Sequence, residues 1–172
     1  MRIAFTGWAG SGKSEAAKYL ELKYNLKRLS FADGIKKIAY DIFNEKEKNR
    51  YLLQSIGDKM REIDEDVWVN HTLNRINSAV CATGFVIDDL RRKNEFDALI
   101  KNFHIFRIIA DEDIRINRLI KRDGYCNVGL LYNKSERGCE SIKLPEIENN
   151  GSIKEFYYKL DNVIKKYIIE KG

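Results

Sequence analysis

The sequence predicts an α/β fold of three layers, in which a parallel sheet lies between helices. Short apolar segments at residues 2–6, 85–87 and 104–109 have the length and composition of buried strands. Helical apolar patterns separate these segments, and strands that alternate with helices form parallel sheets. A glycine-rich turn follows the first strand directly and leads into the first helix. With 172 residues, one proline and no Gly/Ser-rich linker, the chain is expected to form a single domain.

The other elements follow from apolar spacing along the chain. The first helix is predicted over 14–23, where Ala16, Ala17 and Leu20 share one face. A three-four repeat of apolar residues predicts a C-terminal helix over 153–168. In chain order, the remaining predictions are a strand near 26–31, helices at about 35–43, 48–62 and 66–80, and helices at about 92–101 and 112–123. The segment between 124 and 152 is predicted to be irregular.

Composition limits the classes of protein to which the chain can belong. Hydrophobic residues make up 44% and charged residues 33%, which is typical of a folded globular domain. The apolar runs are far shorter than a membrane span, and no secretory signal is recognisable, so we expect a cytoplasmic protein. Three widely spaced cysteines, Cys81, Cys126 and Cys139, favour reduced structural thiols. The net charge of +5 is mixed with acids along the chain, which favours local anion sites over a nucleic-acid surface.

The segment Gly7-Trp8-Ala9-Gly10-Ser11-Gly12-Lys13-Ser14 matches the phosphate-binding P-loop pattern. It also lies in the required context, after a strand and before a helix. Glycines allow successive backbone N–H groups to surround phosphate oxygens, and the following helix adds its positive end. Lys13 is predicted to reach the β- and γ-phosphates, and the Ser14 hydroxyl to bind Mg²⁺. ATP binding is therefore the central prediction from the sequence.

The rest of the chain favours a small-molecule kinase over other P-loop classes. A GTPase needs the guanine-specificity motif Asn-Lys-x-Asp after a late strand. The most similar segment, Asn133-Lys134-Ser135-Glu136, matches this motif poorly. Kinases need a helical insertion that holds the acceptor and arginines that neutralise the transferring group. We predict an acceptor-binding insertion at about 35–83 between core segments 1–34 and 84–172. A lid at about 115–140 would carry Arg115, Arg118 and Arg122 on one helix face.

Several later segments strengthen this prediction through a family resemblance. They are Ser30-Phe31-Ala32-Asp33 before Lys36-Lys37, Leu53-Gln54-Ser55-Ile56-Gly57 through Arg61 to Trp68, Asp89-Leu90-Arg91 with Asn94-Glu95, and Glu148-Asn149-Asn150-Gly151-Ser152. In order and spacing, over most of the chain, they resemble the phage-type deoxynucleoside monophosphate kinases within the nucleoside-monophosphate-kinase-like P-loop group. An enzyme of phage origin would act in the host cytoplasm. The chain departs from the family pattern in the second acid, Asp88, and in lacking a histidine before Ser135.

Independently of the resemblance, the chemistry of several charged residues suggests their roles. Asp89 follows a predicted central strand, where parallel sheets place ligands, and could hold Mg²⁺; Asp88 is the competing choice. Arg91 is predicted to bind the acceptor phosphate, because a guanidinium can pair with it through two hydrogen bonds. Arg61 is a second candidate for that phosphate. Arg118 and Arg122 are predicted to neutralise the transferring group.

The resemblance and the local chemistry together place other residues around the two nucleotides. Asp33 and Trp68 are predicted to border the acceptor pocket, with the indole stacking on a base; a buried core position is the alternative for Trp68. The resemblance implies that Asn149 and Asn150 lie near the adenine of ATP. Ser152 is expected to cap the last helix.

The predicted reaction is ATP- and Mg²⁺-dependent phosphoryl transfer to a (deoxy)nucleoside monophosphate. Alternatives are dephospho-coenzyme A kinase, phosphomevalonate kinase or another small-molecule P-loop kinase. A nucleotide-gated or nucleic-acid-binding module is the alternative outside enzymes, but no strand interleaves aromatic and basic residues as such a surface would. We therefore expect ATP and a small phosphorylated acceptor as partners, without nucleic acid or membrane. The sequence does not choose between a monomer and a homodimer.

Overall fold

The computed structural model describes residues 1–47, 49–79, 82–124 and 138–169. These residues form one five-stranded sheet with the order β2-β3-β1-β4-β5, and every paired strand is parallel to its neighbour. The strands are β1 (Arg2–Thr6), β2 (Lys27–Leu29), β3 (Phe85–Ile87), β4 (His104–Ile109) and β5 (Glu146–Glu148). In the centre, Ile3 of β1 pairs with Val86 on one side and His104 on the other. The predicted α/β class with a parallel sheet is confirmed.

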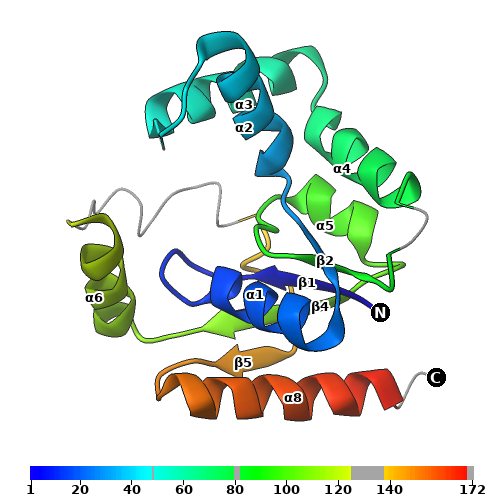
Figure 1. Cartoon of the computed structure of the whole chain (residues 1–172). Coiled ribbons are helices and arrows are strands. Elements are labelled where there is room, and N and C mark those ends of the chain that lie inside the picture. Colours follow the sequence, from blue (N-terminus) through cyan, green and yellow to red (C-terminus); the bar gives the residue numbers. More distant parts are fainter. Residues whose placement is uncertain (48, 80–81, 125–137, 170–172) are drawn as a thin grey trace.

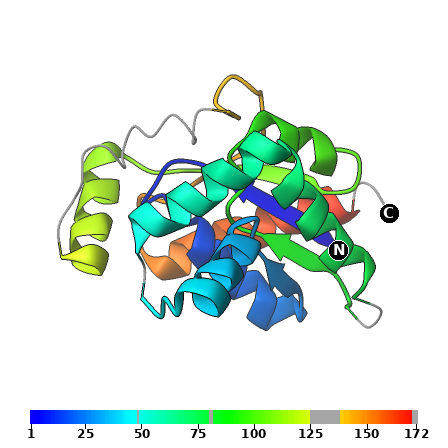
Figure 2. The same cartoon turned by 90° about the horizontal axis from the view of Figure 1, so that it is seen from above.

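Helices cover the sheet and extend beyond its carboxyl edge. They are α1 (Lys13–Tyr24), α2 (Ala32–Phe43), α3 (Arg50–Ile63), α4 (Val67–Asn77), α5 (Lys93–Leu99), α6 (Glu112–Asp123) and α8 (Ile153–Ile169). In Figure 1, α2, α3 and α4 gather above the sheet, and α8 lies below it. The view from above in Figure 2 places α6 at one side of the molecule, apart from the sheet helices.

Alternating side chains of each strand divide the core into two layers. Ile3, Phe5 and Val86 face α1 and α8, where they pack with Leu20 and Leu160. Their neighbours face the opposite side: Ala4, Ile87 and Ile105 pack with residues of α4 and α5 that include Val69, Phe96 and Leu99. Successive strand residues point to opposite faces, so both faces of this sheet are apolar and covered, as parallel sheets require.

The helices above the sheet have a small core of their own. Ile35 and Ala39 of α2 pack with Ile56 of α3 and with Trp68 of α4. Gly34 permits the close approach, since a Cβ there would lie 2.8 Å from the Trp68 ring. The three helices of the predicted insertion therefore pack together, and they join the sheet through the β2–α2 junction and through Val69 and Ile76 of α4.

Element boundaries differ from the predictions mainly where strands are short. The predicted strand at 26–31 contracts to three residues in β2, and β5 was missed in a segment predicted to be irregular. In β5 only Ile147 is buried, between two exposed glutamates, so the strand carries too short a pattern to be recognised. Its place is set by Arg107 N–H, which donates to the Pro145 carbonyl, and by Asn149 N–H, which donates to Ile109.

Some predictions concern residues outside the described part of the chain. The segment 125–137 of the predicted lid, with Cys126, and also Cys81 lie outside it. Cys139 is buried, and burial raises the pKa of its thiol to about 11. Among the described helices, none combines the length and apolar character needed to cross a bilayer.

Packing of α8 predicts a measurable contrast between two positions. Leu160 is fully buried against the sheet, whereas Tyr158 is 69% exposed on the same helix. Leu160→Ala should lower the free energy of unfolding by about 2–5 kcal/mol through lost burial and a cavity. Tyr158→Ala should change it by about 0.5 kcal/mol or less. Urea denaturation of both variants measures the difference, and equal losses would contradict this arrangement of the core.

Candidate nucleotide and phosphate site

The loop between β1 and α1 has the backbone conformation that its glycines predict. Gly7, Gly10 and Gly12 have φ angles of 137°, 81° and 107°, which side-chain-bearing residues rarely adopt. Space is also restricted: a Cβ on Gly7 would lie 2.2 Å from the Ile108 carbonyl oxygen, and one on Gly12 would lie 2.3 Å from Asn149 Nδ2. The loop thus folds closely over the carboxyl ends of β1 and β4.

Lys13 begins α1 and turns back into this loop. Its side chain is buried, and its Nζ donates hydrogen bonds to the carbonyls of Gly7 and Trp8, the second at 2.9 Å. The ammonium group therefore lies against the loop, near the positive end of α1. Ser14 follows with an exposed side chain, and Lys13, Ser14, Gly10 and Gly12 all line one cleft. This geometry suits binding of a phosphate chain.

The cleft has a volume of about 880 Å³ and lies between the P-loop, the start of α2, one face of α3, the segment after β3, and α6. Its wall is rich in charge of both signs. The cationic lining residues are Lys13, Arg50, Arg61, Arg91, Arg92, Arg118 and Arg122, and the acidic ones are Glu15, Asp58, Asp88, Asp89 and Glu95. Such a volume is in the range of small-molecule sites, and the arginines suit phosphate groups.

Opposite the P-loop, three arginines gather around Asp58 and Glu95. Arg61 lies 3.2 Å from the Asp58 carboxylate, and Arg92 lies 3.6 Å from it. The pKa of Arg61 is lowered, first by burial and then by the positive charge of Arg92. Repulsion between neighbouring guanidinium groups would be relieved by a bound anion. The structure thus brings predicted Arg61 and Arg91 together and adds Arg92.

Glu95 holds the segment that carries two of these arginines. It is 4% exposed, and its Oε2 accepts hydrogen bonds from the backbone N–H groups of Arg91 at 2.8 Å and Arg92 at 2.9 Å. Burial raises the pKa of this carboxyl, and the negative charge of Asp89 raises it further. Glu95 therefore fixes the backbone from which both guanidinium groups enter the cleft.

Of the three arginines predicted on one face of α6, Arg118 and Arg122 line the cleft and Arg115 does not. Arg115 is buried beside the P-loop, with its guanidinium 5.9 Å from the centre of the Trp8 ring. Arg118 donates to the Asn149 carbonyl at 3.0 Å, and Arg122 pairs with Asp123 at 2.7 Å. The separation arises because seven residues advance a helix by about 10 Å, so only the first turns of α6 reach the P-loop.

The two predicted adenine residues have different surroundings. Asn149 is buried, and its Nδ2 donates to the Ser11 carbonyl at 2.7 Å, which ties the end of β5 to the P-loop. Asn150 accepts from Asp111 N–H at 2.8 Å and so holds the start of α6. Ser152 Oγ accepts from Glu155 N–H at 3.3 Å, which confirms the predicted helix cap. Adenine contact by either asparagine stays a prediction.

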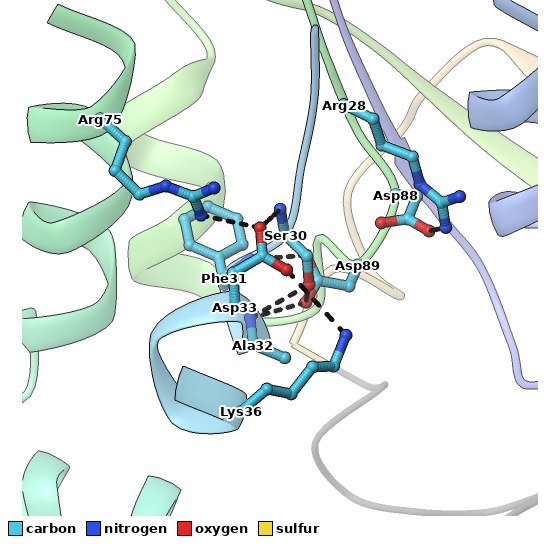
Figure 3. Close-up of polar contacts among 9 residues, drawn as sticks. All are labelled: Arg28, Ser30, Phe31, Ala32, Asp33, Lys36, Arg75, Asp88 and Asp89. Carbon is cyan, nitrogen blue, oxygen red and sulfur yellow. Dashed lines mark hydrogen bonds and ion pairs between the residues drawn. The ribbon is translucent and has the colours of Figure 1, made fainter. Parts of the chain in front are cut away.

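The paired acids Asp88 and Asp89 contact different parts of the protein (Figure 3). Asp88 is 6% exposed and forms an ion pair with Arg28 of β2 through Oδ2. Asp89 accepts hydrogen bonds from Ser30 Oγ at 2.5 Å, Phe31 N–H at 2.9 Å and Ala32 N–H at 3.0 Å. Burial raises the pKa of Asp89, and the Ser30 hydrogen bond opposes that rise.

The two residues expected beside an acceptor base lie in structural positions instead. Trp68 is 4% exposed within the core of the insertion, and its Nε1 donates to the Gly57 carbonyl at 3.2 Å. Asp33 accepts from Ser30 N–H at 3.0 Å and from Arg75 at 2.7 Å. Neither lines the cleft in the described structure. Trp68 thus occupies a buried core position, which was the alternative to base stacking, because its apolar neighbours on α2 and α3 cover the ring.

Other cleft residues were missed by sequence reasoning. Arg50, Gln54 and Asp58 come from α3, as does the predicted Arg61, and Arg92 follows Arg91 directly. The α3 residues are three or four positions apart, so the spacing of polar residues opposite the apolar face was a usable signal. For Arg92 no local pattern distinguishes it from Arg91; only the chain path after β3 brings both to the cleft.

Comparison with known proteins agrees with this geometry. A family model described as an AAA domain matches residues 3–138. The chain belongs to this AAA domain family of P-loop proteins. Adenylate kinase from Bartonella quintana is 32% identical over 138 residues, which cover 71% of this chain and 66% of the relative. Adenylate kinase from Francisella philomiragia is 29% identical, over 71% of this chain and 55% of the relative. The chain thus spans less than two thirds of these relatives.

More distant comparisons cover greater lengths. Adenylate kinase from Acetivibrio thermocellus is 25% identical over all of this chain and 88% of the relative. The crystal structure of TT1252 from Thermus thermophilus superposes with a TM-score of 0.65 at 18% identity, covering 100% of this chain and 98% of that one. A sugar kinase from Janibacter gives 0.54 at 14% identity, over 95% and 92%. These matches support a nucleoside-monophosphate-kinase-like P-loop fold; the narrower resemblance to phage-type enzymes stays a prediction.

Crowding at the P-loop predicts that Gly12→Ala abolishes most nucleotide binding. The new Cβ would collide with Asn149 and require an unfavourable φ of 107°. Gly124→Ala is the matched control, because its φ is also positive at 78° but no atom of the described residues lies within 4 Å of the new Cβ. Titration of each folded variant with ATP should show an affinity lower by at least about tenfold for Gly12→Ala only. Unchanged affinity in Gly12→Ala would contradict the P-loop assignment.

Proposed function

We propose that the chain is an ATP-dependent kinase that transfers the γ-phosphoryl group to a (deoxy)nucleoside monophosphate and forms the diphosphate. One observation carries the proposal: residues of the P-loop and the group Arg61, Arg91 and Arg92 line one and the same cleft. A module that only binds a nucleotide needs the first part, whereas phosphoryl transfer needs two phosphate sites facing each other. The adenylate kinase relatives support the same class of reaction.

The proposed chemistry requires positioning and charge neutralisation more than proton transfer. A phosphate oxygen of the acceptor is already a nucleophile, so no general base is needed. Lys13 and the backbone N–H groups of the P-loop would bind the ATP phosphates, and Arg61, Arg91 and Arg92 the acceptor phosphate. Arg118 and Arg122 would neutralise the transferring group.

Magnesium fits the residues at the centre of the cleft. Mg²⁺ prefers oxygen ligands and usually keeps several waters, so one or two protein oxygens suffice beside substrate phosphates. The Ser14 hydroxyl and the carboxylates of Asp88 and Asp89 all line the cleft. The described residues contain no cluster of three or more metal-binding side chains, which agrees with an ion that arrives with the nucleotide. Bound there, the ion would neutralise phosphate charge.

The wall between the two phosphate sites suits a nucleobase. Phe31, Ile35 and Leu53 provide apolar surface, and Gln54 provides an amide that can both donate and accept. Apolar walls with a few polar groups are typical of small-molecule pockets. The same features would also accommodate another phosphorylated acceptor, such as dephospho-coenzyme A or phosphomevalonate, so the assay must include both.

An ATP-consumption assay with Mg²⁺ tests the proposal directly. A panel of nucleoside and deoxynucleoside monophosphates, dephospho-coenzyme A and phosphomevalonate should yield at least one nucleoside monophosphate that accelerates ATP loss. Lys13→Ala should reduce this rate by a factor of about 10² or more while the fold persists, because its charge acts on the γ-phosphoryl group. Acceleration by dephospho-coenzyme A alone would replace the proposed acceptor. No acceleration by any acceptor would indicate a binding module.

Alanine substitutions in the two groups of arginines should have different effects on the steady-state kinetic constants. Arg91→Ala should raise the acceptor KM and lower kcat, because its contact is proposed in both ground and transition states. Arg118→Ala and Arg122→Ala should act mainly on kcat, by factors of up to about 10³, since charge on the transferring group changes during the reaction. The double variant Arg118→Ala/Arg122→Ala tests whether one compensates for the other. A uniform, salt-dependent weakening in all variants would contradict these roles.

A further inference from the structure

The junction between β2 and α2 is held by a carboxylate that is remote in sequence. α2 begins after Phe31, whose side chain cannot accept a hydrogen bond, so the residue at the N-cap position does not cap the helix. The first N–H groups of a helix need acceptors. Asp89, at the end of β3, supplies them: Oδ1 accepts from Phe31 N–H and Oδ2 from Ala32 N–H. The negative charge also lies at the positive end of α2.

Ser30 completes this contact from the end of β2. Its hydroxyl donates to Asp89 Oδ2 at 2.5 Å and accepts from Ala32 N–H at 3.1 Å. Its own N–H donates to Asp33, which Arg75 of α4 also contacts. Figure 3 shows the two carboxylates converging on the same short segment, Asp89 from the sheet and Asp33 from the helix. The segment 30–32 is therefore fixed from both the core and the insertion.

Both acids line the cleft, but the neighbouring Asp88 has different contacts. Its Oδ2 pairs with Arg28, and within the described residues no hydrogen bond is formed by Oδ1. Both Asp89 oxygens, in contrast, are engaged by donors from the junction. A metal ion at Asp89 would compete with these donors, whereas Asp88 can offer an oxygen without releasing α2.

We propose that the two acids divide their work: Asp89 is a positioning residue that caps α2 from a distance, and Asp88 is the acid that serves the metal. Phe31 and Ala32 form cleft wall, and Arg91 follows Asp89 by two residues. By holding that wall, Asp89 fixes the distance between the acceptor pocket on α2 and the arginines after β3. This assignment rests on the proposed kinase function, and it identifies which acid serves the metal and which one positions the wall of the acceptor pocket.

Asp89→Asn and Asp88→Asn are the paired variants that test this division. Asp89→Asn should raise the acceptor KM by about tenfold, because losing a charged acceptor for three donors loosens the pocket wall, and should leave the Mg²⁺ concentration dependence unchanged. Asp88→Asn should shift the Mg²⁺ dependence to higher concentration by about tenfold and change the acceptor KM little. Ser30→Ala removes one of the three contacts and should change the acceptor KM in the same direction as Asp89→Asn, by a smaller factor.

Two readouts do not depend on turnover. Hydrogen exchange of the Phe31 and Ala32 amides should accelerate at least about tenfold in Asp89→Asn but not in Asp88→Asn, with thermal melting as the control for global unfolding. Calorimetric titration with ATP should show that Mg²⁺ strengthens binding to Asp89→Asn as in the unchanged chain, and less so to Asp88→Asn. If no acceptor accelerates ATP loss but amide exchange is faster in Asp89→Asn, only the kinase proposal is contradicted. Unchanged amide exchange, or a lost Mg²⁺ effect in Asp89→Asn, would overturn the division of roles.

Discussion

The close path of the P-loop over the carboxyl ends of β1 and β4 is the constraint on which the site depends. Three positive-φ glycines allow this path, and Lys13 and Asn149 hold the loop by hydrogen bonds to its carbonyls. Because all five strands are parallel, the segments after β1, β3, β4 and β5 all leave at the same edge of the sheet. One loop geometry and one strand direction together assemble the cleft.

Charge in the cleft is balanced locally rather than accumulated. Arg61 and Arg92 share Asp58, and Arg50 shares Asp123 with Arg122. Unpaired guanidinium groups at this density would repel one another, so each carboxylate reduces the repulsion within the cleft. A dianionic phosphate can exchange with such a carboxylate, since both accept two hydrogen bonds from one guanidinium. The arginines are thus held near their proposed ligands without a large cost in repulsion.

Attachment of the insertion links fold to function. α2, α3 and α4 share a small core, and the β2–α2 junction, held by Asp89 and Asp33, joins α2 to the sheet. Val69 and Ile76 of α4 also pack on the sheet itself. A second contact at the far end connects Arg50 of α3 to Asp123 of α6. Both contacts border the cleft, so movement of the insertion would change the cleft directly.

The sequence by itself determined the parallel α/β class, the P-loop, the helical insertion and the cleft positions of Arg61, Arg91, Arg118 and Arg122. These follow from local rules, because strand and helix periods, glycine conformations and motif spacing are encoded within a few residues. Tertiary structure alone decided that Trp68 is core, that Arg115 lies beside Trp8, and that Asp88 and Asp89 contact different partners. Adjacent acids are equivalent in a sequence; what distinguishes them is which donors the folded chain brings from β2 and α2, some sixty residues away.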